Sequence, residues 1–184
     1  MRTMCGAQEC LLCQYFYVNI LFMIDDIKIK VGALVTNQVG DKALFIKEKI
    51  KKKDRPLWNI IQGTYGDREN ETILEATIRE CKEEALVNVE VKNFLGAYIS
   101  SDETKFRALF AFLVEATEGK PAIPRKEDQD LRQESIIEVK WFTREEIASI
   151  PKEEFISSRS FAIVHQWLRN ESYPLAMYKQ IPFD

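Results

Sequence analysis

The chain has 184 residues, of which 46% are hydrophobic and 30% are charged, and its formal net charge is −3. A chain of this length can bury a sizeable core as one domain and is too short for two comfortable domains. The weak negative charge provides no field that would recruit nucleic acid or an anionic membrane surface, and the sequence has no apolar run of about 18 residues that would span a bilayer.

Residues 1–22 differ from the rest of the chain. They begin with a weakly basic segment, and the apolar stretch that follows is interrupted by Gln14 and Asn19. A secretory signal peptide is one interpretation, but no A-x-A cleavage site follows. Because the sequence from Met23 onward already contains a whole domain, we expect residues 1–22 to be a dispensable extension or a mis-assigned start. The domain is then residues 23–184, and the expected location is the cytoplasm.

Three of the four cysteines lie close together near the N-terminus. They are Cys5, Cys10 and Cys13, and the fourth is Cys81. A zinc site is one interpretation, but no second pair completes the usual spacing, and the single histidine, His165, is distant. We interpret His165 as a structural histidine in an apolar helical pattern. Disulfides are not expected in a chain that can form an adequate core.

The first part of the domain reads as short strands separated by turns. Residues 27–36 are rich in β-branched side chains, and residues 43–47 form a second strand-like segment. The basic segment KEKIKKKDR, residues 47–55, has two interpretations, a solvated connector or a rim that attracts phosphate. Residues 56–61 are predicted to form a short strand that leads into a glycine-containing loop.

The second part of the domain combines a hairpin with two further helices. Residues 89–100 and 106–115 are predicted strands joined by a short turn, and residues 117–133 are polar and contain two prolines, which indicates a long loop. The remaining elements are a strand at 136–142, a short helix that opens with a capping box at Thr143 and ends before Pro151, and an amphipathic helix at 158–169. Without regular βαβ alternation, this order predicts an α+β fold.

The most informative segment is ETILEATIRECKEE, residues 71–84, within a predicted helix at 72–86. On a helix, Glu80, Glu83 and Glu84 stand at i, i+3 and i+4, so three carboxylates share one face. Like charges this close cost stability unless a cation neutralises them, and oxygen-only ligands suit Mg²⁺ or Mn²⁺. The opposite face is apolar and is expected to be buried; it carries Leu74, Ile78, Cys81 and Ala85.

These residues resemble the signature of the Nudix hydrolase family. That signature is a Gly, five residues, a Glu, seven residues and then R-E-U-x-E-E-x-G-U, where U is aliphatic. The matching positions are Glu71, Arg79, Glu80, Cys81, Glu83, Glu84 and Val87.

Two positions depart from the signature. Tyr65 stands where the first Gly is expected, although Gly63 and Gly66 flank it. Leu86 stands at the second Gly, which normally ends the helix in a left-handed conformation. We therefore expect the helix cap to shift to Asn88, the neighbouring residue that best tolerates a positive φ.

The resemblance implies a fold as well as an activity. The fold would be a mixed β-sheet sandwiched between α-helices, extending from about residue 27 to 169. The activity would be metal-dependent hydrolysis of a nucleoside diphosphate linked to another moiety X, such as a nucleotide or a nucleotide sugar. A weaker similarity links Ser158-Arg159-Ser160 and Tyr173-Pro174-Leu175 to the carboxyl end of small Nudix phosphatases that act on nucleoside di- and triphosphates.

The resemblance also implies roles for the acidic residues. Glu80, Glu83 and Glu84 would hold Mg²⁺ or Mn²⁺, and Glu71 would be a further ligand or the partner that orients Arg79. The residues predicted to act in catalysis are Arg79, Glu80 and Glu83. The general base is either Glu80 or a loop acid, for which the candidates are Glu103, Asp128, Asp130 and Glu134.

Substrate recognition would require an aromatic surface and a few polar groups. Gly63, Trp58 and Tyr65 are the predicted substrate-binding residues, and core packing is the competing interpretation for the two aromatic side chains. The expected partner is a small molecule, with no nucleic acid and no membrane, and the oligomeric state stays open, with a homodimer as one option. Two other functions compete: a catalytically silent Nudix-fold nucleotide-sensing module, and an acidic interaction helix in an unrelated fold.

Overall fold

The computed structural model describes residues 26–181. The expectations for residues 1–22, including those for Cys5, Cys10 and Cys13, therefore lie outside the described residues. Within the described part of the chain, no helix is long and apolar enough to cross a membrane.

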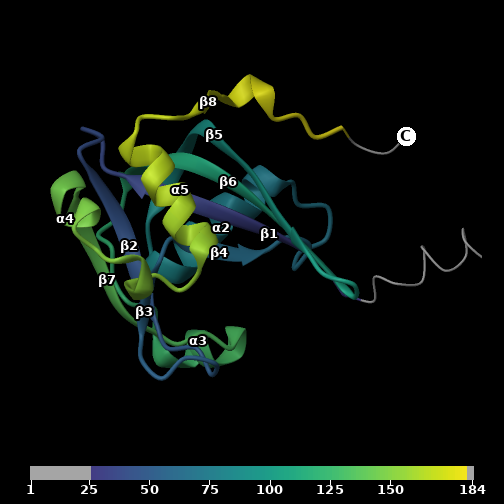
Figure 1. Ribbon diagram of the computed structural model, residues 1–184, viewed down its shortest axis with the longest axis horizontal. Helices are drawn as coiled ribbons and strands as arrows, with labels where there is room; N and C mark the ends of the chain where they lie inside the picture. The colour runs from purple at the N-terminus through teal and green to yellow at the C-terminus, as the bar shows by residue number, and fades with distance from the viewer. Residues whose placement is uncertain (1–25, 182–184) are drawn as a thin grey trace, which may run out of the picture.

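A mixed β-sheet runs through the centre of the molecule (Figure 1). Its main path is β3-β2-β1-β6-β5-β8, with β4 paired to β1 and β7 paired to β2. The β1–β6 pair is parallel, and the other named strand pairs are antiparallel. The strands are β1 Asp26–Thr36, β2 Lys42–Glu48, β3 Leu57–Asn59, β4 Ile61–Thr64, β5 Asn88–Ser101, β6 Lys105–Glu118, β7 Ile136–Thr143 and β8 Tyr173–Pro174.

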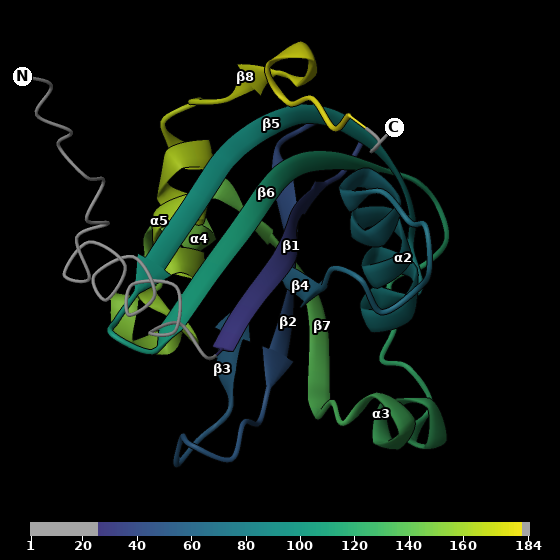
Figure 2. The same ribbon diagram turned by 90° about the vertical axis from the view of Figure 1, so that its right-hand side faces the viewer.

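Helices cover both faces of the sheet, as Figure 2 shows. Helix α2, Ile73–Ala85, lies on one face, and helices α4, Arg144–Ala148, and α5, Ser158–Leu168, lie on the other. Side chains alternate along β1, so that Val31, Ala33 and Val35 pack with α2 whereas Leu34 packs in the second core with α5. The predicted α+β fold, with a mixed sheet between helices, is confirmed.

The strand predicted at 56–61 is two strands in the structure. β1 pairs with β2 only at Val35 and Thr36, so the two strands diverge toward their other ends. The chain then fills both open edges: β3 pairs with β2, and β4 pairs with β1 (Figure 2). The break at the buried residue Ile60 lets one short segment serve two partners, which local propensity could not predict.

The long loop predicted at 117–133 contains a helix, α3, Lys126–Arg132. Its local support is polar, with ion pairs between Arg125 and Asp128 and between Lys126 and Asp130. The buried Gln129 fixes its position, because its amide donates to the Pro124 carbonyl at 3.0 Å and accepts from the Ile136 N–H at 2.7 Å. The residue that holds α3 in place is therefore polar. For this reason the segment lacks the apolar pattern from which a helix would have been predicted.

The buried face of α2 is rotated from the predicted one. Ile78 is 39% exposed and Leu74 is half-buried, whereas Ile73, Ala76 and Thr77 are buried with Cys81 and Ala85. Glu80 and Glu84 are also buried, because β4 lies against the carboxylate side of the helix. The prediction that Ile78 faces the core is therefore wrong, since α2 packs against protein on more than one side.

Leu86 itself caps the carboxyl end of α2. Its backbone is left-handed, with φ 58° and ψ 31°, and its N–H donates to the Cys81 carbonyl. The predicted shift of the cap to Asn88 is wrong, since Asn88 begins β5. Tertiary contacts hold this turn: the Ala122 N–H donates to the Ala85 carbonyl at 3.2 Å, and Gly119 approaches the Leu86 carbonyl so closely that an added Cβ would lie 2.9 Å from it.

Replacing Leu86 with Gly is expected to stabilise the fold. A side chain in the left-handed region costs about 1–2 kcal/mol, and the extra backbone entropy of Gly offsets roughly 0.5–1 kcal/mol of that gain. We expect a higher urea midpoint with an unchanged m-value. Asn88→Gly is the matched control and should lower the midpoint, because Gly weakens an extended strand. A lower midpoint for Leu86→Gly would show that the Leu86 side chain stabilises the cap.

Candidate active site

The local sequence at the start of α2 fixes where its carboxylates point. Thr72 forms a capping box, accepting from the Glu75 N–H at 3.2 Å while its own N–H donates to the Glu75 carboxylate at 2.7 Å. The helix therefore begins at a defined residue. Because α2 packs along β4, the side chains at 80 and 84 project toward that strand.

Arg79 is the hub of the carboxylate array. Its guanidinium binds both oxygens of Glu71 at 2.9 and 3.0 Å, one oxygen of Glu80 at 2.7 Å and one of Glu83 at 3.1 Å. It also donates to the Thr64 carbonyl of β4 at 3.2 Å. These hydrogen bonds hold the pKa of the Glu71 carboxyl below its ordinary value. One arginine thus fixes the orientation of Glu80 and connects the helix to the strand beneath it.

Gly63 makes room for the Glu80 side chain. A Cβ built on Gly63 would lie 1.7 Å from the Glu80 carboxyl carbon and 1.8 Å from one of its oxygens. No side chain could occupy that space while Glu80 keeps its position. Beside it, the Gln62 N–H donates to Glu84 at 3.2 Å, so the backbone of β4 contacts two carboxylates in succession.

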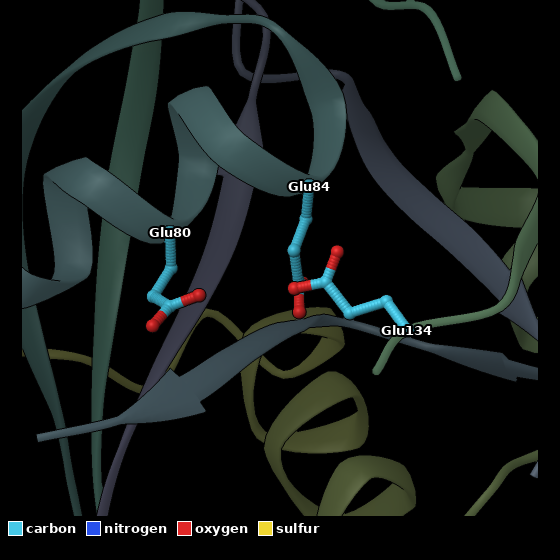
Figure 3. A group of neighbouring side chains, drawn as sticks. All are labelled: Glu80, Glu84 and Glu134. Atoms are coloured by element: carbon cyan, nitrogen blue, oxygen red, sulfur yellow. The ribbon is translucent and has the colours of Figure 1, made fainter. Parts of the chain in front are cut away.

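Three carboxylates converge where α2, β4 and the segment after α3 meet. Glu80, Glu84 and Glu134 each offer an oxygen, and these atoms lie within 4.8 Å of one another. Figure 3 shows the Glu84 and Glu134 side chains meeting beneath the helix, with Glu80 on the neighbouring turn. Burial raises the pKa of Glu80 to about 7 against the lowering effect of Arg79, and burial together with neighbouring carboxylates raises the pKa of Glu84 well above its ordinary value.

Arg132 fixes the position of Glu134. Its Nε donates to both Glu134 oxygens at 3.0 and 3.1 Å, and its guanidinium also donates to the Glu83 carbonyl at 3.1 Å. The segment after α3 is thereby connected to the last turn of α2. The sequence offered four loop acids without a choice among them, and the structure brings Glu134 to the array.

A cavity of about 1030 Å³ opens beside these carboxylates. Its lining includes Glu80, Glu83 and Glu84 of α2 and, from the segment at and after the end of α3, Arg132 and Glu134. The basic segment between β2 and β3 contributes Lys49, Lys51, Lys52 and Lys53 to the lining. The interpretation of residues 47–55 as a rim is thus consistent with where its lysines lie, whereas Arg55 is paired with Glu154.

The family model described as the NUDIX domain matches residues 26–162, most of the chain. This chain belongs to the Nudix family. The acidic interaction helix in an unrelated fold is therefore excluded. A comparison with curated proteins finds no significant match.

Solved structures, including two described as Nudix hydrolases, share the fold of this chain. A Nudix hydrolase from Nitrosomonas europaea superposes with a TM-score of 0.66 at 19% identity, covering 85% of this chain and 98% of that one. A MutT Nudix hydrolase from Burkholderia pseudomallei gives 0.58 at 18% identity, with 77% and 98% covered. The ORF135 protein of E. coli gives 0.59 at 17% identity, with 78% and 91% covered. Family and structural neighbours together support a hydrolase that acts on phosphoanhydride-type substrates.

The Nudix signature residues divide into two groups in the structure. Glu80 and Glu84 join Glu134 in the carboxylate cluster. Glu71 and Glu83, also predicted as ligands, lie outside this cluster and pair with arginines, Glu71 with Arg79 and Glu83 with both Arg68 and Arg79. Glu80 pairs with Arg79 as well, and the ligand roles of Glu71 and Glu83 stay predictions. Of the two roles considered for Glu71, this geometry favours the partner that orients Arg79.

The aromatic side chains predicted to bind substrate lie away from the cavity. Trp58 is 8% exposed and packs edge-to-face on Phe142, with the centroids 4.8 Å apart. Tyr65 is half-buried and packs against the core on the α2 side of the sheet. Neither lines the cavity, whereas Gly63 does. His165 stacks on Phe161 with centroids 4.0 Å apart, which agrees with a structural role.

Sequence reasoning missed Glu48 and the polar network behind it. Glu48, at the end of β2, lines the cavity and accepts from the Asn59 amide at 2.9 Å. The side-chain oxygen of Asn59 in turn accepts from the Ser160 hydroxyl of α5 at 2.7 Å and from the Gln62 side-chain amide at 3.1 Å. Burial raises the pKa of Glu48 despite the hydrogen bond from Asn59. The sequence did show Glu48 as an acid among lysines, which could have marked it as a candidate site residue. Nothing in the neighbouring residues indicated that Glu48 lies near Glu84.

Replacing Arg79 with Lys is expected to lower kcat by about 10–100-fold, the effect of losing a group that orients ligands. Lysine keeps the charge but cannot bind Glu71 with two hydrogen bonds and reach Glu80 as well. Arg68→Lys is the matched control, because Arg68 makes a single exposed ion pair with Glu83, and it should change kcat by less than about twofold. Equal rates for both variants would show that the hub does not position Glu80.

Proposed function

We propose that this protein is a divalent-metal-dependent pyrophosphohydrolase that cleaves a nucleoside diphosphate linked to another moiety. The observation that carries the proposal is the convergence of Glu80, Glu84 and Glu134, with oxygens within 4.8 Å of one another, in the lining of a cavity. Two of these acids are almost fully buried. Buried carboxylates repel one another strongly unless a cation or a proton neutralises them.

The donor set fits Mg²⁺ or Mn²⁺. All the converging side-chain atoms are carboxylate oxygens, which are hard ligands, and no histidine or cysteine offers an atom to the group among residues 26–181. Glu80, Glu84 and Glu134 would hold the ion. When bound, such an ion neutralises phosphate oxygens and makes a bound water more acidic.

The chain's own residues would position the reacting groups. Arg79 keeps Glu80 in place and Arg132 keeps Glu134 in place, so neither carboxylate can rotate freely. In the reaction a water oxygen bonds to phosphorus, the bridging phosphorus–oxygen bond breaks, and a carboxylate takes the water proton. Glu80 and Glu134 are the candidates for that base, because they belong to the carboxylate cluster, whereas Asp130, which also lines the cavity, pairs with Lys126.

The test is a substrate panel with Mg²⁺ and with Mn²⁺, scored for release of phosphate or pyrophosphate. We expect turnover of at least one nucleoside diphosphate derivative, and none after a chelator removes the metal. The competing function, a silent sensing module, would bind a nucleotide derivative without turnover. Retention of every signature carboxylate favours the enzyme.

We further propose that the substrate is a small molecule met in the cytoplasm, with neither nucleic acid nor membrane as a partner. The net charge of −3 supports the absence of an electrostatic nucleic-acid surface. The oligomeric state is a separate measurement, for which light scattering during gel filtration would distinguish a monomer from a homodimer.

A further inference from the structure

The lysines beside the carboxylate cluster form no ion pair within residues 26–181, although the charge of Lys30 acts on Glu48 and opposes the effect of burial on the pKa of that carboxyl. Lys49, Lys51, Lys52 and Lys53 line the cavity together with Lys30 of β1. Within residues 26–181, the lysines that form ion pairs are Lys92 and Lys126, and neither lines the cavity. This lysine wall, defined as Lys30, Lys49, Lys51, Lys52 and Lys53, is therefore available to an anionic ligand.

Four acids of the same cavity, Glu80, Glu83, Asp130 and Glu134, pair with cations outside the lysine wall. Arg79 neutralises part of the α2 array, Arg132 pairs with Glu134, and Arg68 pairs with Glu83. The carboxylate cluster would take the cation and with it the diphosphate that is cleaved. The lysine wall is not needed for that task, so its charge points to further phosphate groups on the ligand.

The size and chemistry of the cavity agree with such a ligand. Its volume of about 1030 Å³ is at the upper end of ligand sites, which are roughly 300–1,000 Å³. None of the described lining residues is aromatic, and Ile50 is the apolar side chain among them. A nucleobase therefore finds no ring to stack on here, because Trp58 is held in the core.

We propose that the lysine wall is a subsite for phosphate groups beyond the scissile diphosphate. The substrate is accordingly a polyphosphorylated small molecule with three or more phosphates, recognised by charge rather than through a stacked base. This inference rests on the proposed function, since it names the substrate class for the same hydrolysis. The bond that breaks and the water that attacks are unchanged.

The test separates phosphate number from base recognition. Adenosine 5′-diphosphate, triphosphate and tetraphosphate keep the base constant, whereas inorganic tripolyphosphate keeps the phosphate number of the triphosphate and lacks the base. At low ionic strength we expect kcat/KM to rise about tenfold for each added phosphate, the scale of electrostatic capture. Removing the base should change kcat/KM by less than about threefold, since no stacking is lost.

Changing Lys51, Lys52 and Lys53 together to Ala should reduce the rise in kcat/KM to about twofold for each added phosphate. High salt should bring the wild type toward the same value, because screening acts over roughly 8 Å at physiological strength. The matched control changes the exposed Lys28, Lys105 and Lys120 to Ala, which alters the net charge equally away from the cavity. The control should retain the full phosphate dependence.

Each outcome decides between the two proposals. The subsite proposal is wrong, and the proposed function stands, in either of two cases. In the first, all substrates are hydrolysed with equal kcat/KM. In the second, the control variant loses as much of the dependence of kcat/KM on phosphate number as the lysine-wall variant does. ADP-ribose, a nucleoside diphosphate linked to another moiety, is included as a further substrate. If neither it nor any of the phosphate series is hydrolysed, the proposed function is wrong. Calorimetric titration with inorganic tripolyphosphate then decides the subsite: about tenfold weaker binding by the lysine-wall variant supports it, and equal binding overturns it.

Discussion

Replacing Glu84 with Gln should lower kcat by about 10²-fold or more and at the same time stabilise the metal-free protein. Glu84 is 5% exposed and lies within 4.8 Å of Glu80 and Glu134, so the substitution removes both a ligand and a source of repulsion. The loss of rate is on the scale of removing one group that stabilises transition-state charge. The amide oxygen of Gln can still accept the hydrogen bond from the Gln62 N–H, and the new amide N–H groups have the neighbouring Glu80 and Glu134 carboxylates as acceptors.

The gain in stability is expected to be about 1–2 kcal/mol, because a buried charge without a full set of partners is costly. For a domain of this size, that gain raises the melting temperature by roughly 2–4 °C for each kcal/mol. Adding Mg²⁺ should raise the melting temperature of the wild type and have a smaller effect on the variant, since ligands stabilise the state that binds them. Differential scanning fluorimetry with and without Mg²⁺ measures both effects.

The control is Glu90→Gln, which removes an exposed carboxylate of β5 that pairs with Lys92 outside the cavity. It should leave kcat and the Mg²⁺ response unchanged. A Glu84→Gln variant with near wild-type rates and the full Mg²⁺ response would contradict the assignment of Glu84 to the ion.

Replacing Gly63 with Ala is the second change with a large expected effect. The added methyl group would lie 1.8 Å from a Glu80 oxygen, so the Glu80 carboxylate or strand β4 has to move. Moving Glu80 breaks its 2.7 Å bond to Arg79 and disturbs the cluster. We expect kcat to fall by about 10²-fold, the loss that a displacement of about 1 Å in catalytic geometry can cause. Crowding at the site should also cost about 1–3 kcal/mol in the free energy of unfolding.

Gly40→Ala is the matched control for this change. Gly40 has φ +78°, but no atom lies within 4 Å of the position that its Cβ would take. The control should therefore cost about 1–2 kcal/mol through its backbone conformation and leave kcat unchanged. Urea unfolding and steady-state rates on both variants separate loss of fold from loss of site geometry. If Gly63→Ala kept the wild-type rate, Glu80 would not need its observed position.

Local spacing in the sequence was sufficient to predict α2 and its carboxylates. The i, i+3, i+4 placement of Glu80, Glu83 and Glu84 follows from helix geometry alone, and the capping box at Thr143 likewise needs only four consecutive residues. The strands of the hairpin and the α+β class also follow from patterns within single segments. These features depend on contacts between near neighbours, so the sequence by itself determined them.

Tertiary structure decided which acids meet and kept the predicted aromatic side chains out of the cavity lining. Glu134 joins Glu80 and Glu84 across about 50 residues because Arg132 and the buried Gln129 fix the segment around it. Glu48 lies near Glu84 only because β2 diverges from β1, β4 pairs with β1 in the opening, and α2 packs along β4. From the sequence, Trp58 could pack in the core or bind substrate. Its edge-to-face contact with Phe142 places it in the core. Each of these depends on pairing between distant strands, which the alternation within one segment does not encode.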